Sequence, residues 1–183
     1  MKLYSYVVHH DTGLAPNPYS RVCTLCRCKY RKPGGTRRNI VELAEEGDWV
    51  VGTGGADKRK SAGHGKLVYA MRVDKKLTRE EYYACPRFKA REDNEPPKVD
   101  FEKPEQFVLI SRHFYYFGAN AIDIPFPKLE KRGPWFRSDF DPEFIRRFVE
   151  WLERQGKPPG KHGEPCQKDH DKPKGSKTCK SSC

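Results

Sequence analysis

Short β-rich runs, with no long helix between them, constrain the fold of this 183-residue chain more than any other feature. Residues 2–10, 48–53, 66–73 and 107–117 are rich in the β-branched and aromatic residues that favour extended backbone. A doubly wound sheet would require crossover helices between successive strands, and no segment suits one. We therefore predict an α+β fold: a small, mostly antiparallel β-barrel with helices at its edges.

Three helices are predicted at these edges. Asn39 offers an N-cap oxygen for a short helix ending near Glu46, and Gly47 suits its left-handed C-terminal position. Thr78 and Glu81 have the spacing of a capping box, which predicts a second helix that stops before Pro86. The last helix, over 142–155, carries an amphipathic stripe made of Phe144, Ile145, Phe148, Trp151 and Leu152.

The chain is expected to form one folded domain, residues 1–155, followed by a basic tail, residues 156–183. The tail contains no aromatic or branched aliphatic side chain, so we predict that it is disordered. No stretch reaches the roughly 20 apolar residues of a membrane span, and residues 1–11 lack the apolar region of a secretory signal. These features predict a cytoplasmic protein without a membrane partner, whose seven cysteines stay reduced.

The positive charge of the chain is concentrated in one segment. The formal net charge is +11, and residues 21–38 contain seven basic side chains and no acidic one, whereas residues 39–155 are balanced. Concentrated positive charge favours a polyanion, because binding releases condensed counterions. The alternative is a basic loop that serves only solubility. We predict phosphate contacts from Arg21, Arg27, Lys29, Arg31, Lys32, Arg37 and Arg38.

Four sequence blocks carry a resemblance to known domains. The pair GDWVVGTGG (47–55) and GKLVYAMRV (65–73) resembles the strand pairs of PUA-like barrels, including the EVE, ASCH and YTH groups. Together with DTGLAPNPYSRVCTLCRCK (11–29) and SRHFYYFGANAIDIP (111–125), they resemble the nucleotide modification associated domain 2 family. The resemblance runs from Tyr4 to about Leu152. It implies a setting in base modification, with components of such a system as partners, but no defined reaction.

A PUA-like barrel would grip a nucleobase between aromatic faces and read its edge with polar groups. Stacking on a side-chain ring contributes about 1–3 kcal/mol per base. The aromatic candidates are Trp49, Tyr69, Tyr115 and Tyr116, of which alternation along a strand would turn about half into the core. The polar candidates are Asp11, Asn17, Ser111, Arg112 and His113.

Two cysteine clusters raise the question of zinc. Cys23, Cys26 and Cys28 supply three thiols, and His64 or Cys85 would have to supply the fourth ligand. Because the ligand set is incomplete, a packing role is favoured for these cysteines. A reactive cysteine is the alternative, because neighbouring arginines would lower the pKa of a thiol. In the tail, Cys166, His170, Cys179 and Cys183 have zinc-like spacing, but a flexible tail is favoured, because no apolar residue surrounds them. We therefore predict neither metal nor cofactor.

The leading functional hypothesis is a noncatalytic domain that binds nucleic acid or a modified nucleotide. The glycine-rich stretches match neither a P-loop nor a dinucleotide fingerprint. The alternative is an enzyme acting on a nucleobase or nucleotide, with Asp11, Cys23 or His113 as acid, base or nucleophile. A protein-interaction module is a third possibility.

Overall fold

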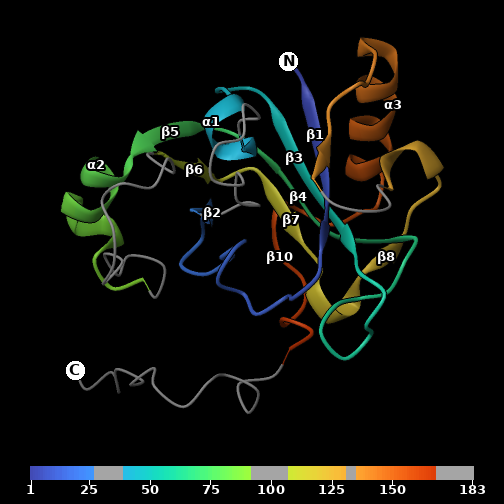
Figure 1. The fold of residues 1–183 in the computed structure, drawn as a ribbon, viewed down its shortest axis with the longest axis horizontal. Coiled ribbons are helices and arrows are strands. Elements are labelled where there is room, and N and C mark those ends of the chain that lie inside the picture. Colours follow the sequence, from blue (N-terminus) through green and yellow to red (C-terminus); the bar gives the residue numbers. More distant parts are fainter. Residues whose placement is uncertain (27–38, 92–106, 131–134, 168–183) are drawn as a thin grey trace.

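A mixed seven-stranded β-sheet forms the centre of the molecule (Figure 1). The computed structural model describes residues 1–26, 39–91, 107–130 and 135–167. The strands lie in the order β10-β7-β4-β3-β1-β9, and β8 pairs with β4. Their bounds are β1 Leu3–Val8, β3 Trp49–Gly54, β4 Lys66–Arg72, β7 Phe114–Tyr116, β8 Ile122–Asp123, β9 Phe136–Arg137 and β10 Gly160–Lys161.

The fold is α+β, as predicted, but its large sheet does not close. Strands β3 and β4 form an antiparallel hairpin. The pairs β1 with β3 and β10 with β7 are parallel, however, so the sheet is mixed. Within the described ranges, β10 and β9 remain its two edges and no closed barrel forms. The expected PUA-like barrel is therefore not confirmed.

A smaller, antiparallel sheet packs beside the large one. It contains β2 (Cys23–Leu25), β6 (Phe107–Ser111) and β5 (Lys75–Thr78), in that order. The single predicted run over 107–117 is therefore two strands, β6 in the small sheet and β7 in the large sheet. The turn between them is held by Asp74, whose Oδ2 accepts hydrogen bonds from the amides of Arg112 (2.5 Å) and His113 (3.3 Å).

The helices begin where the sequence predicts, because each has its capping side chain. Asn39 caps α1 (Ile40–Leu43), Thr78 and Glu81 form the capping box of α2 (Arg79–Ala84), and Asp141 caps α3 (Pro142–Glu153). Short 3-10 helices lie at Pro86–Phe88, Gly118–Asn120 and Pro127–Leu129. Gly47 does not end α1, which ends at Leu43 with Ala44 as its C-cap; instead, Gly47 has a φ of +89° in the turn before β3.

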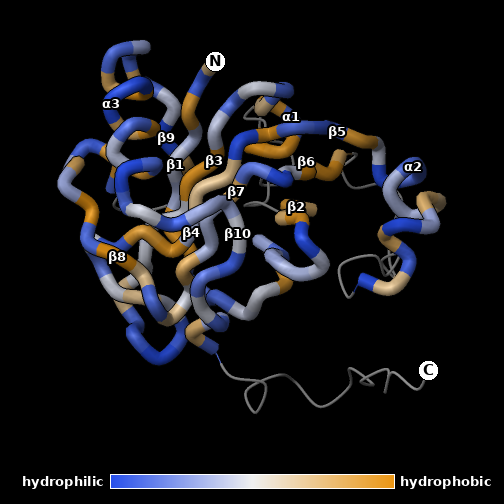
Figure 2. Tube along the Cα trace, turned by 180° about the vertical axis from the view of Figure 1, so that it is seen from behind, coloured by the Kyte–Doolittle hydropathy of each residue, from blue (hydrophilic) through white to orange (hydrophobic). Residues whose placement is uncertain are grey.

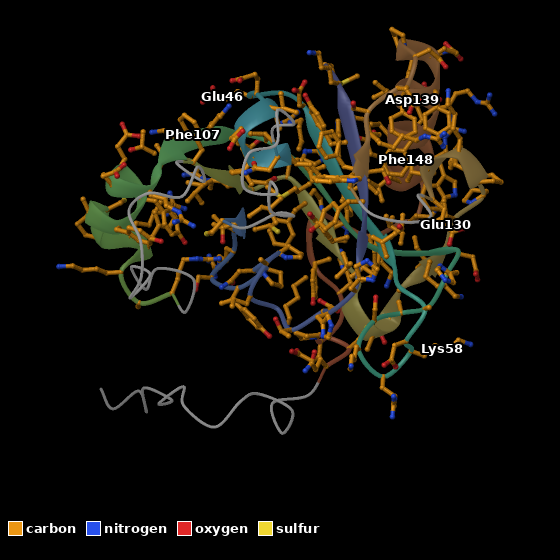
Figure 3. The ribbon with its side chains drawn as sticks, in the orientation of Figure 1. Glu46, Lys58, Phe107, Glu130, Asp139 and Phe148 are labelled. Atoms are coloured by element: carbon orange, nitrogen blue, oxygen red, sulfur yellow. The ribbon has the colours of Figure 1, made fainter. Side chains whose placement is uncertain are left out.

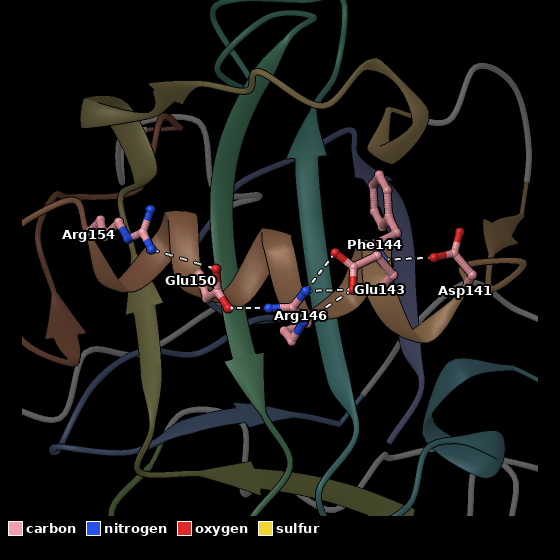
Figure 4. Close-up of polar contacts among 6 residues, drawn as sticks. All are labelled: Asp141, Glu143, Phe144, Arg146, Glu150 and Arg154. Carbon is pink, nitrogen blue, oxygen red and sulfur yellow. Dashed lines mark hydrogen bonds and ion pairs between the residues drawn. The ribbon is translucent and has the colours of Figure 1, made fainter.

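The large sheet is covered on both faces. Phe148 and its neighbours on α3 pack against Leu3, Trp49 and Tyr115 on one face. The opposite face carries Tyr69 and Tyr116 and packs against α1 and the small sheet. Figure 2 shows the apolar residues gathered along the strands, and Figure 3 shows Phe148 and Phe107 on opposite sides of the sheet. Polar contacts such as Arg146 with Glu143 lie on the outer side of α3 (Figure 4).

Residues 157–167, called the strap below, are ordered against the sheet. Within the strap, β10 pairs with β7, and the amide of His162 donates to the carbonyl of Tyr116 (2.7 Å). The predicted disorder is therefore wrong for 157–167, because main-chain hydrogen bonds and the stacking of the His162 ring on Phe117 hold the strap in place. Residues 168–183 lie outside the described residues, so the division into a domain and a tail stays a prediction.

Candidate functional site

The four aromatic candidates lie on two opposite faces of the large sheet. Trp49 and Tyr115 belong to the cluster under α3, and Tyr69 and Tyr116 belong to the cluster under the small sheet. All four are at most 3% exposed. They cannot line one pocket together, and each now packs against other side chains of the core.

His113 lies between two of these rings. Its ring centroid is 5.6 Å from that of Trp49 and 5.8 Å from that of Tyr115, both in edge-on geometry. Burial, and then the charge of Arg72, lower the pKa of His113 below its usual 6.5. The imidazole is therefore neutral at pH 7 and serves as a packing group on the α3 face.

Asp11 is fully buried and tied to two parts of the chain. Its Oδ1 accepts a hydrogen bond from the Tyr116 hydroxyl (2.5 Å), and its Oδ2 accepts one from the amide of Cys166 (3.0 Å). Burial raises the pKa of Asp11, while these hydrogen bonds oppose the rise. Burial and the neighbouring charge of Asp11 also raise the pKa of the Cys166 thiol to about 12, which makes it a poor nucleophile.

The remaining polar candidates hold loops in place. Asn17 is 3% exposed, and its Oδ1 accepts from the amide of Tyr19 (3.2 Å), while its main chain pairs with Thr24. The Ser111 hydroxyl donates to the carbonyl of His113 (2.8 Å) and closes the turn between β6 and β7. Cys23 is 0% exposed and lies opposite Ser111 in the small sheet.

A half-open hollow of about 440 Å³ lies between three segments of the chain. The first is the loop before β2, the second is the turn between β6 and β7, and the third is the strap. Its lining residues are Pro18, Tyr19, Ser20, Arg21, Arg112, Phe114, Pro159, Gly160 and Lys161. The structure thus brings together Arg21 and Arg112, two candidates that lie far apart in the sequence.

The hollow is positively charged and carries one exposed ring. Arg21 and Arg112 are exposed, and neither side chain forms an ion pair within the described part of the chain. Tyr19 is 39% exposed, and Lys161 places its Nζ 4.7 Å from the centre of the Tyr19 ring while pairing with Glu164. Such a surface suits a ligand that combines a planar ring with an anionic group.

Arg91 fixes the loop that supplies Tyr19. Its guanidinium is 7% exposed and donates to the carbonyls of Asn17 (3.0 Å) and Tyr19 (2.5 Å). It also donates to the hydroxyls of Thr24 (2.9 Å) and Tyr82 (3.1 Å). The loop is therefore anchored from inside, which leaves Tyr19 and Arg21 preorganised at the surface.

The cysteine clusters can be followed only in part. Cys23 and Cys26 are buried thiols in different hydrophobic clusters. Cys85 packs against the cluster that contains Cys26, and His64 pairs with Glu130. Among the residues that the structure describes, no group of three or more Cys, His, Asp or Glu could hold a metal ion. Cys28, His170, Cys179 and Cys183 lie outside the described residues.

Tyr19 and the strap line the hollow but are not among the candidates predicted from the sequence. Tyr19 follows the Pro-Asn-Pro turn directly, and an exposed aromatic beside a rigid turn was the available signal. Lys161 gave no signal, because its segment has no apolar pattern. Of the predicted basic segment, Arg27, Lys29, Arg31, Lys32, Arg37 and Arg38 lie outside the described residues, so their phosphate contacts stay predictions.

Comparison with known proteins gives one family. No curated protein and no solved structure matches the chain. Among the described residues, no helix combines the length and the apolar character needed to cross a membrane. The model of the nucleotide modification associated domain 2 family matches residues 1–100 and 93–172, which together span most of the sequence. The chain therefore belongs to the nucleotide modification associated domain 2 family.

Proposed function

We propose that the protein binds a nucleotide, either free or within a nucleic acid, in the hollow between the Tyr19 loop and the strap. One observation carries this proposal: Arg21 and Arg112 flank an exposed aromatic ring in a space of about 440 Å³. Volumes of about 300–1,000 Å³ are usual for small-ligand sites. The family's name adds a base-modification context.

In this proposal, the cations hold phosphate and the ring contacts the base. Guanidinium groups match phosphate oxygens in a bidentate geometry, so Arg21 and Arg112 suit this task. Lys161 covers part of Tyr19, and the base would lie against the rest of the ring. The basic residues of 27–38 would extend the phosphate contacts along a longer strand.

The site favours binding over catalysis. Asp11 and Cys23, two of the three catalytic candidates, are both 0% exposed, and His113 packs on the opposite, α3-covered side of the large sheet. None of them lines the hollow. A noncatalytic reader in a base-modification system is therefore the function that we propose.

The test is a calorimetric titration with four probes: adenosine, adenosine 5′-monophosphate, and unstructured single-stranded DNA and RNA. We expect the monophosphate to bind. Adenosine should bind at least about tenfold more weakly, because it lacks the phosphate that the arginines would contact. The two oligonucleotides show whether the ligand is a free nucleotide or part of a strand.

The matched variants reverse two charges each. Arg21→Glu with Arg112→Glu should weaken binding by about 10- to 100-fold for each arginine replaced and should flatten its salt dependence. Arg147→Glu in α3 with Arg154→Glu at its C-cap makes the same change in net charge at exposed positions away from the hollow. Equal weakening in both double variants would mean that the net charge of the protein alone causes the loss of affinity, and would contradict the proposed site.

A further inference from the structure

The strap is part of the candidate site and is held by a buried carboxylate. Pro159, Gly160 and Lys161 form one wall of the hollow, and Tyr19 and Arg21 form another. Asp11 begins the loop that carries the Tyr19 wall, and its side chain accepts a hydrogen bond from the strap at Cys166. One residue therefore lies where the two walls are joined.

We propose that Asp11 is a positioning residue: it clasps the strap against β7 and the Tyr19 loop, and so completes the hollow. The inference rests on the proposed function of the hollow and adds to it the residue that assembles the site.

The contacts around Asp11 connect three elements. Its carboxylate oxygens accept from Tyr116 of β7 and from Cys166 of the strap. Its main chain adds two further bonds, because its carbonyl accepts from the amide of Gln167 (2.9 Å) and its amide donates to the carbonyl of Lys60 (2.7 Å). Removing the carboxylate would leave the buried hydroxyl of Tyr116 and the amide of Cys166 without this acceptor.

Other contacts also attach the strap. Main-chain hydrogen bonds include the amide of Ala119 to the carbonyl of Glu164 (2.7 Å), and the ring of His162 stacks on those of Phe117 and Tyr115, with centroids 5.6 Å and 6.4 Å apart. Close approach is possible because a glycine lies on each side of this contact, Gly118 in the sheet-side segment and Gly163 in the strap. A Cβ at Gly118 would lie 2.1 Å from the carbonyl oxygen of Glu164, and one at Gly163 would lie 1.9 Å from that of Phe117.

Tyr19 lies next to the strap, so a displacement of the strap would affect this ring directly. A Cβ on Gly13 would lie 2.7 Å from Pro165 of the strap and 3.2 Å from the ring of Tyr19. Lys161 of the strap contacts the same ring. Displacing the strap would therefore remove Lys161 from the hollow and also the support behind Tyr19.

The test combines hydrogen exchange with ligand titration in the full chain. Asp11→Asn leaves one acceptor oxygen where the carboxylate has two, and Tyr116→Phe removes only the hydroxyl. Tyr69→Phe is the matched control, because Tyr69 is equally buried, faces the same side beside Tyr116, and contacts Tyr6 instead of Asp11. Amides of Val68 and Ala70 in β4 report global opening and show whether each variant folds.

We expect Asp11→Asn and Tyr116→Phe to speed the exchange of the amides of His162, Cys166 and Gln167 by about tenfold, and to weaken binding of adenosine 5′-monophosphate by a similar factor. The control should change neither. Unchanged strap exchange in both variants would overturn the clasp, and a loosened strap with unchanged affinity would overturn its role in the hollow. If the wild type binds no nucleotide, the proposed function fails, while the exchange data still decide the clasp.

Discussion

The face of the sheet under α3 and the hollow beside the strap are built from different interactions. Under α3, Trp49, Phe148 and Leu152 bury their rings and aliphatic groups almost completely, and the charges of the helix stay on its outer side (Figure 4). Around the hollow, loops are held by polar contacts to Arg91 and Asp11, and cations remain exposed. The first region buries apolar surface, whereas the second leaves Arg21 and Arg112 exposed to solvent.

The largest effect is expected from Phe148→Ala on α3. Truncating a fully buried phenylalanine removes about 3–5 kcal/mol of stability, because apolar burial is reduced and a cavity forms. Denaturant unfolding measures this, and the affinity of the folded fraction for nucleotide should not change. Arg147→Ala, on the exposed side of the same helix, is the control and should stay within about 0.5 kcal/mol. A destabilisation below about 1 kcal/mol for Phe148→Ala would contradict the assignment of a stabilising apolar core to the α3 face.

Tyr19→Ala is expected to have a smaller effect, and to change the affinity for nucleotide rather than the stability. This ring is 39% exposed, so its removal should cost little stability. Without this stacking surface, the affinity for nucleotide should fall by about 1–3 kcal/mol, as measured by calorimetry. Tyr19→Phe keeps the ring and should retain the affinity. Equal affinity of the alanine variant and the wild type would remove Tyr19 from the site.

The smallest effect concerns pH, because burial and hydrogen bonds act on Asp11 in opposite directions. Burial raises the pKa of Asp11 above its usual 3.8. The folded state then binds the proton more tightly than the unfolded state, so the stabilising contribution of Asp11 is complete below pH 3.8 and is lost as the pH rises through the folded pKa.

The Asp11→Asn variant has no titratable side chain at this position. The free energy of unfolding of the wild type, relative to this variant, should therefore fall as the pH rises from below 3.8 toward neutrality. Denaturant unfolding of both proteins across this range measures the difference. A wild-type advantage that grows with pH would mean that the carboxylate is stabilised, rather than penalised, by its surroundings.

Much of the α3 side could be predicted from the sequence. The stripe from Phe144 to Leu152 repeats with the helical period, and Asp141 and Pro142 mark the start of α3, so pattern and capping agree. Strands β1, β3 and β4 followed from β-branched and aromatic runs in the same way. These signals come from side chains that are buried in one element.

The hollow could be predicted only in part, because its position depends on contacts between distant segments. Arg21 and Arg112 were both candidates, but no periodic pattern shows that β6 and β7 belong to different sheets or that the turn between them meets the loop before β2. The strap has no apolar pattern from which its main-chain hydrogen bonds could be predicted, and the sequence does not show that Asp11, a candidate for base recognition and for catalysis, is buried.

The most direct test of the central claim is to map backbone amide chemical shifts of the ¹⁵N-labelled full chain while adenosine 5′-monophosphate is added. The account predicts that the shifted amides cluster at Tyr19, Ser20, Arg21, Arg112 and Lys161, which line the hollow. Shifts confined to the α3 face, around Trp49 and Phe148, or the absence of any shift at saturating nucleotide, would contradict it.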